Sequence, residues 1–177
     1  MSQLKELLVD EMRDLLYAEN LLTKALPKMA SAAHNPKLRE AFEKHLTQTQ
    51  GHVERLKKSF DLLGEKATAK PCKAMEGLVA EGEERIQETR DKQEFLADLA
   101  LIAAAQKVEH YEISGYGTLR DLARQAGQIE VSNLLSHTLG EEESADFLLS
   151  EVSKPIIQKA ASEHLSTQTG KKQTVGV

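Results

Sequence analysis

Four long stretches of this chain repeat apolar residues at intervals of three and four, and two of the three breaks between them are short. The first stripe is Leu4, Leu8, Leu15, Leu22, Leu26 and Met29. This spacing places the apolar side chains on one face of an α-helix. The pattern therefore predicts four long amphipathic helices, and each of them must bury its apolar face against another element.

Turn signals set the expected ends of these helices. Asn35 followed by Pro36 is an N-cap and first-turn pair, and Gly127 is a typical helix stop. Pro27 removes a backbone hydrogen bond, so it is expected to kink the first helix or to end it early. The long helices are expected at residues 2–33, 36–64, 93–126 and 129–161, and a shorter amphipathic helix at residues 72–88.

The lengths of the connections predict how the helices pack. Two tight turns make the first pair and the last pair of long helices antiparallel hairpins, and the short helix lies in the long crossover between the hairpins. We therefore expect an all-α fold, a four-helix bundle with the ferritin-like connectivity of one long crossover. The bundle is expected to span residues 1–162. The tail of residues 163–177 lacks an apolar stripe and is expected to be disordered.

Composition and charge argue against several classes of protein. The 177 residues carry a net charge of −5, whereas nucleic-acid-binding proteins usually have a basic stripe or arm. No stretch approaches the roughly 18 apolar residues that span a bilayer, and the N-terminus lacks the pattern of a signal peptide. The one cysteine, Cys72, cannot form an internal disulfide. We expect a cytoplasmic protein that binds neither nucleic acid nor membrane.

Ionisable side chains interrupt the apolar stripes near the middle of each long helix. An unpaired buried carboxylate costs several kcal/mol or takes up a proton, and no Arg or Lys lies within a turn on the stripe of Glu109 and Glu112. Within the run of residues 141–143, helical phase selects Glu142 as the inward member and leaves the other two on a solvated face. The inward positions are Glu19, His45, His52, Glu109, Glu112 and Glu142.

The spacing from the turns places these groups at one height. Glu19 precedes the first tight turn by sixteen residues, and His52 follows it by seventeen. Glu112 and Glu142 lie fifteen residues before and after the second tight turn. Residues equally far from a short turn meet in an antiparallel hairpin, because each residue advances by about 1.5 Å. We therefore expect these side chains to lie in one layer of the bundle.

Carboxylates combined with imidazoles suit Fe(II), Mn(II) or Zn(II) better than Ca(II), which prefers six to eight oxygen ligands. Two such ions can share bridging carboxylates. The residues leave two interpretations open. One is a metal site, which the bundle connectivity favours. The other is a hydrated polar core without tightly bound metal, in a non-catalytic structural or interaction protein.

Five segments resemble a known family. They are LYAEN at 16–20, AFEKHLTQTQGHVERL at 41–56, PCKAMEGL at 71–78, LIAAAQKVEHYEISGYGTL at 101–119 and TLGEEESAD at 138–146. They resemble the YciF/YciE family of bacterial stress proteins, also known as domain of unknown function 892, over roughly residues 3–160. The resemblance implies a ferritin-like homodimer with a role in stress response. It also implies a dinuclear site for Fe or Mn, with Zn as an alternative, and peroxide or O₂ as a small oxidant.

Rubrerythrin-like sites use Glu on the first helix, Glu-x-x-His on the second, Glu-x-x-Glu on the third and Glu-x-x-His on the fourth. The second motif here reads Thr49-x-x-His52 and the fourth reads Glu142-x-x-Ala145, so each lacks one ligand. A site with fewer charged ligands holds two divalent ions less tightly. The resemblance implies the metal ligands Glu19, His52, Glu109, Glu112 and Glu142, with His45, Gln48 and Asp146 as substitutes.

Overall fold

The computed structural model of the chain describes residues 3–172, with side chains over residues 3–162. This part of the chain forms five α-helices, and none of its residues lies in a β-strand. The expected all-α architecture is therefore confirmed. The helices are α1 (Gln3–Ala32), α2 (Pro36–Leu63), α3 (Lys73–Glu88), α4 (Glu94–Gln125) and α5 (Ile129–Lys172).

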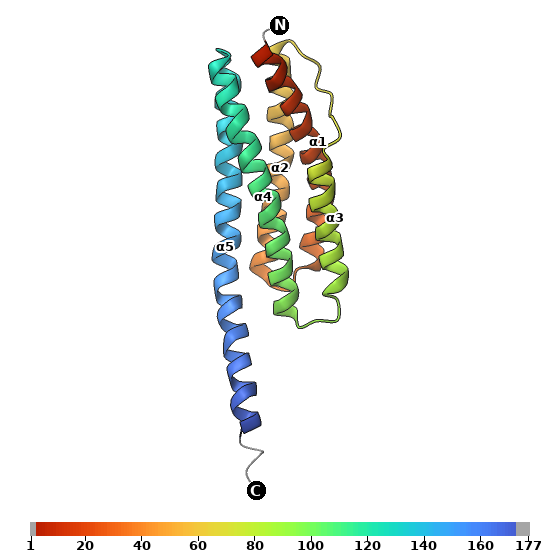
Figure 1. Ribbon diagram of the computed structural model, residues 1–177, viewed down its shortest axis with the longest axis vertical. Coiled ribbons are helices and arrows are strands. Elements are labelled where there is room, and N and C mark those ends of the chain that lie inside the picture. Colours follow the sequence, from red (N-terminus) through yellow and green to blue (C-terminus); the bar gives the residue numbers. More distant parts are fainter. Residues whose placement is uncertain (1–2, 173–177) are drawn as a thin grey trace.

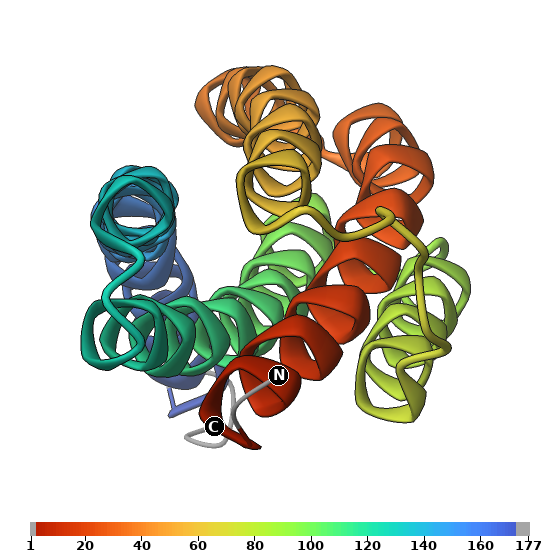
Figure 2. The same cartoon turned by 90° about the horizontal axis from the view of Figure 1, so that it is seen from above.

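The four long helices lie side by side around a shared apolar core (Figure 1). α1 packs against α2 and α4 packs against α5, as expected for two hairpins with short turns. The hairpins meet through two further contacts, α2 with α5 and α1 with α4. Figure 2 shows α3 outside this ring, and it packs against α1 and α4. The interior is therefore left to the inner faces of the four long helices.

The turn between α1 and α2 is held by its own cap and by α4. The side-chain oxygen of Asn35 accepts hydrogen bonds from the backbone N–H groups of Lys37 and Leu38. The buried carboxylate of Asp98, on α4, accepts the N–H of His34 at 2.8 Å and the N–H of Asn35 at 2.9 Å. A side chain of the second hairpin thus binds the turn of the first.

The turn between α4 and α5 depends on one glycine. Gly127 has a φ of 74°, which only glycine adopts without strain. Its N–H donates to the carbonyl of Arg124, and the N–H of Gln128 donates to the carbonyl of Ala123 at 2.8 Å. These bonds close the last turn of α4, so the predicted helix stop is confirmed.

One helix is not interrupted by its proline, and another runs further than the sequence suggested. α1 continues through Pro27 to Ala32, so the proline does not end it early. The buried Met29 and Ala30 pack after the proline, and this packing offsets the one lost hydrogen bond. α5 continues past Ala161 to Lys172, because no glycine or proline intervenes before residue 170.

The expected disorder of residues 163–177 stays a prediction. Residues 173–177 lie outside the described part of the chain, and so do the side chains of residues 163–172.

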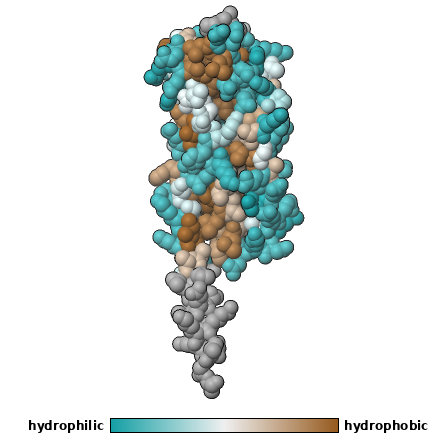
Figure 3. All heavy atoms as spheres, in the orientation of Figure 1, coloured by the Kyte–Doolittle hydropathy of each residue, from teal (hydrophilic) through white to brown (hydrophobic). Residues whose placement is uncertain are grey.

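The face of the molecule drawn in Figure 3 combines hydrophilic and apolar residues. Figure 3 shows apolar patches between the hydrophilic side chains on one face. Phe147 and Leu148, neighbours on α5, are among the large apolar residues that remain exposed. Within residues 3–172, no helix combines the length and the hydropathy that crossing a bilayer would require.

Gly115 lies where α4 passes close to α1. A β-carbon at Gly115 would lie 3.1 Å from both terminal methyl carbons of Leu15, which is tighter than an ordinary contact. A β-carbon at Gly117 would meet nothing within 4 Å. The first glycine therefore permits the approach of the two helices, and the second does not contribute to it.

Gly115→Val is expected to destabilise the protein by about 1–3 kcal/mol, because the added methyl groups must displace Leu15 and strain the core. Gly117→Val is the matched control and is expected to change stability by only a few tenths of a kcal/mol, as the helix propensities of the two residues suggest. Urea unfolding followed by circular dichroism measures both variants. Equal urea midpoints for Gly115→Val and Gly117→Val would contradict the close contact between Gly115 and Leu15.

Candidate metal centre

Six ionisable side chains lie inside the apolar core of the described residues, close to one another. Each is at most 5% exposed. All four long helices contribute to this set, so the layer predicted from the turn spacing is present. The residues are Glu19 from α1, His45 and His52 from α2, Glu109 and Glu112 from α4, and Glu142 from α5.

His52 joins the first group of these side chains. Its Nδ1 lies 2.8 Å from Oε1 of Glu142 and 3.3 Å from Oε1 of Glu19. The hydroxyl of Tyr116 donates a hydrogen bond to the same oxygen of Glu19. Atoms of Glu19, His52 and Glu142 all lie within 4.8 Å of one another. One cation could therefore contact all three side chains.

His45 joins the second group. Its Nε2 lies 3.4 Å from Oε1 of Glu109 and 3.5 Å from Oε2 of Glu142. Atoms of these three residues and of Glu112 again lie within 4.8 Å of one another. Glu142 belongs to both groups. The arrangement therefore fits two neighbouring cation positions that share one carboxylate.

Most polar atoms of the two groups have no hydrogen-bond partner. The distances from the histidine nitrogens to the carboxylate oxygens given above are therefore close contacts whose angles do not suit a hydrogen bond. A buried polar group without a partner costs about 1–3 kcal/mol. Metal ions bound by carboxylates and imidazoles would supply the missing partners, so the residues present fit a metal. The unpaired atoms are both oxygens of Glu112 and Glu142, both ring nitrogens of His45, Nδ1 of His52, and one oxygen each of Glu19 and Glu109.

Burial and mutual repulsion act on the two carboxyl groups of α4. Burial, followed by the charges of Glu142 and Glu19, holds the pKa of Glu112 well above its ordinary value of 4.5. Burial and the nearby charge of Glu142 raise the pKa of Glu109 in the same way. In the metal-free protein these carboxyl groups therefore resist ionisation.

The two histidines respond to this environment in opposite directions. Burial lowers the pKa of His52, but contacts with Glu142 and Glu19 outweigh burial and raise this pKa to about 10. Burial raises the pKa of Glu142, but its contacts with His52 and His45 bring that pKa below the ordinary value. Burial dominates at His45 and lowers its pKa. His52 is thus the cationic member of the metal-free cluster.

Among the three substitute ligands, only His45 joins the groups. Gln48 lines a pocket of ≈ 30 Å³ beside His45. Asp146 accepts a hydrogen bond from Gln106 at 3.0 Å, and its Oδ1 lies 3.5 Å from Nε2 of His110. These contacts with α4 hold Asp146 at the partly exposed interface between α4 and α5, and it belongs to neither group.

Two residues beside the site were not assigned to it from sequence. Glu141, assigned to a solvated face, lies 3.0 Å from Nε2 of His52. A rule that a buried imidazole needs a partner on each nitrogen would have suggested a search for such an acceptor. Tyr116 is fully buried against Glu19. Its position four residues after Glu112 put it on the same helical stripe, and this was the available signal.

Comparisons with known proteins agree with the predicted resemblance. The family described as a domain of unknown function (DUF892) matches residues 3–162. Protein YciF of Escherichia coli strain K12 is 42% identical over 162 residues, which cover 91% of this chain and 96% of YciF. The crystal structure of that stress protein matches with a TM-score of 0.85 at 40% identity, over 90% of this chain and 99% of that chain. YcfI of Rhodopseudomonas palustris matches with a TM-score of 0.79 at 38% identity, over 84% and 94% of the two chains.

Proposed function

This chain belongs to the DUF892 family, and we propose that it is a ferritin-like four-helix bundle that binds two divalent metal ions and acts in stress response. One observation carries the metal proposal: two groups of buried, unpaired ligand atoms share Glu142. The stress-response part rests on the similarity to the E. coli stress protein YciF. A homodimer, which the family resemblance implies, is part of the same proposal.

The balance of charge supports two ions rather than one. The two groups contain four carboxyl groups, which carry four negative charges when ionised. Two divalent cations carry four positive charges. A single ion would leave uncompensated charge in the core, and each unpaired buried charge costs several kcal/mol. Occupation of both positions therefore allows every carboxyl group to ionise.

The donor set favours iron or manganese, with zinc as a third candidate. Glu19, His52 and Glu142 would hold one ion. The other ion would be held by His45, Glu109, Glu112 and Glu142. Bound iron or manganese would supply redox chemistry toward a small oxidant such as peroxide or O₂. The second α2 imidazole, from His45, offsets the histidine that the motif on α5 lacks.

A small pocket supports access by such an oxidant. Its volume is ≈ 30 Å³, and its lining includes His45, Glu109 and the small side chains of Ser144 and Ala145. This space holds about one or two water-sized molecules. The pocket therefore fits peroxide or O₂ and excludes a larger organic substrate.

Removal of metal is expected to lower the melting temperature of the protein. A ligand at a hundred times its dissociation constant stabilises the folded state by about 2.7 kcal/mol. For a chain of this size, each kcal/mol corresponds to about 2–4 °C. Protein purified without chelator should contain about two Fe or Mn ions per chain by elemental analysis. Dialysis against EDTA should remove these ions and lower the midpoint measured by circular dichroism.

The alternative function predicts different results from the same samples. A non-catalytic helical protein with a hydrated polar core would contain less than one ion per chain, and EDTA would leave its midpoint unchanged. Addition of peroxide to the Fe(II)-loaded protein, followed by absorption spectroscopy, tests the redox part separately. An unchanged spectrum would limit the function to metal binding.

A further inference from the structure

The imidazole of His52 lies between inner and outer carboxylates. Its Nδ1 faces Glu142 and Glu19 in the buried cluster, at 2.8 Å and 3.3 Å. Its Nε2 faces Oε2 of Glu141, at 3.0 Å. The ring itself is fully buried. Both nitrogens therefore have a defined neighbour, and only the Nδ1 side belongs to the candidate metal centre.

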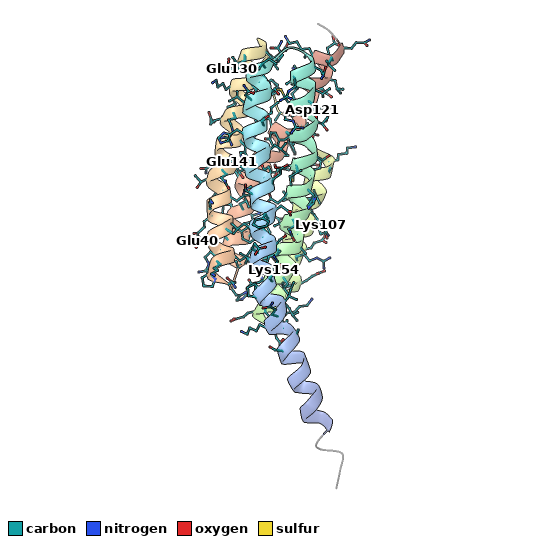
Figure 4. All side chains as sticks on the ribbon, turned by 90° about the vertical axis from the view of Figure 1, so that its left-hand side faces the viewer. Glu40, Lys107, Asp121, Glu130, Glu141 and Lys154 are labelled. Atoms are coloured by element: carbon teal, nitrogen blue, oxygen red, sulfur yellow. The ribbon has the colours of Figure 1, made fainter. Side chains whose placement is uncertain are left out.

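Glu141 is in turn held in place from α2. Its Oε2 accepts a hydrogen bond from the guanidinium of Arg55, and the Nε of Arg55 donates to the hydroxyl of Thr138 at 2.9 Å. The side chain of Glu141 is 24% exposed, and His137 lies near its other oxygen at 3.8 Å. Figure 4 shows Glu141 in the upper part of α5, where the helix runs beside the rest of the bundle. Arg55 thus fixes the position of this carboxylate at the edge of the core.

His45 has no equivalent support. Neither of its ring nitrogens has a hydrogen-bond partner. Its neighbours Glu109 and Glu142 both lie on the side of Nε2, at 3.4 Å and 3.5 Å. Among the described residues, no carboxylate lies within ion-pair distance of its Nδ1, the ring nitrogen on the other side. The two imidazoles of the cluster differ in this respect, although both come from α2.

We propose that Glu141 is a positioning residue for the metal centre: it accepts the Nε2–H of His52 and so leaves Nδ1 free to bind the ion. A histidine that binds a metal commonly donates its other N–H to a carboxylate, which fixes the tautomer and strengthens the ligand. The inference rests on the proposed metal-binding function. It makes the position of Glu19, His52 and Glu142 the tighter of the two, because its imidazole is oriented before the ion arrives.

Zinc is a suitable probe, because it binds the same donor types and is diamagnetic, so the histidine rings can be observed by NMR. Glu141→Leu removes the acceptor, and its zinc affinity in the tighter step should fall about 10–100-fold. Glu141→Gln keeps an acceptor oxygen without the charge and should lose less. Glu143→Gln is the matched control, since Glu143 lies on the same helix, is exposed and should leave the affinity unchanged. Chelator competition gives the affinities.

The imidazole ¹⁵N spectrum of the zinc-loaded protein provides a readout that a merely structural role would not change. His52 should bind zinc through Nδ1 and keep its proton on Nε2 in the native protein. In Glu141→Leu this pattern should be lost or mixed, while circular dichroism of the metal-free variant stays native. If the leucine variant does not fold, the glutamine variant still tests the inference.

Several outcomes would overturn the inference. Zinc on Nε2 of His52 would do so, as would equal affinities for the native protein and both Glu141 variants. A similar loss in Glu143→Gln would show that general charge, and not orientation, sets the affinity. If the native protein binds zinc and the Glu141 variants bind zinc with the same affinity, the role given to Glu141 is wrong and the proposed metal binding is unaffected. If the native protein binds no zinc, the proposed function fails with it.

Discussion

Glu112→Leu is expected to stabilise the metal-free protein and to reduce its stabilisation by metal, because only the cation position formed by Glu19, His52 and Glu142 is left intact. Glu112 is fully buried, and neither of its carboxylate oxygens has a hydrogen-bond partner. Leucine has a similar volume and needs no partner, so the substitution removes an unpaired buried group that costs about 1–3 kcal/mol. The melting temperature in EDTA should therefore rise by about 2–4 °C for each kcal/mol. Thermal unfolding with EDTA and with excess Mn(II) measures both effects.

This variant is informative because its melting temperature in EDTA should rise while its stabilisation by Mn(II) should fall. Glu143→Leu is the control, because Glu143 is exposed on α5 and contributes to neither group. That variant should keep the native response to Mn(II). If leucine at position 112 lowers the midpoint in EDTA and leaves the stabilisation by Mn(II) as large as in the native protein, Glu112 is a paired structural residue. The proposed second cation position would then be wrong.

The metal-free protein is expected to lose stability as the pH rises from about 5 to about 10. The raised pKa values of Glu109 and Glu112 mean that the folded protein keeps protons that the unfolded chain releases above about pH 4.5. Folding then takes up protons, so stability is greatest at low pH and falls as the pH rises. His52 acts in the same direction between its ordinary value of 6.5 and its raised pKa of about 10. Each group contributes up to about 1.4 kcal/mol per pH unit.

Two groups oppose this trend over limited ranges. The lowered pKa of His45 favours the folded state as the pH rises toward 6.5, and the lowered pKa of Glu142 acts only below about pH 4.5. Urea unfolding in EDTA at pH 5, 7 and 9 should therefore show a net decline. The Mn(II)-loaded protein should show the reverse, because metal binding requires deprotonated ligands. Parallel pH profiles with and without Mn(II) would count against the metal centre.

The fold was predictable because its signals are local and regular. Apolar spacing identified the long helices, and the signals at Asn35 and Gly127 placed the two short turns. Since helical rise is constant, residue counts from those turns put Glu19 and Glu112 at the same height. The end of α5 was not predictable in this way, because residues 162–169 contain no glycine or proline to stop a helix.

The details of the site were less predictable because they depend on small rotations between helices. His45 and Gln48 are both close to the second stripe, and only the packing of α2 in the bundle brings His45 within 3.4 Å of Glu109. Glu141 lies about 100° of helical rotation from Glu142, so its periodicity indicates solvent. It reaches His52 because α2 and α5 pack directly together. Such a contact between helices cannot be predicted from the spacing of residues along either helix alone.

Asp98 has a consequence for the cluster although it lies fourteen residues before Glu112 on α4, or roughly 21 Å along the helix axis. Its carboxylate fastens the backbone amides of His34 and Asn35, so the first hairpin cannot slide along the second without breaking both bonds. A slip of one residue would shift Glu19 by about 1.5 Å relative to its partners. The alignment of donor atoms at the centre of the molecule is thus secured at one of its ends.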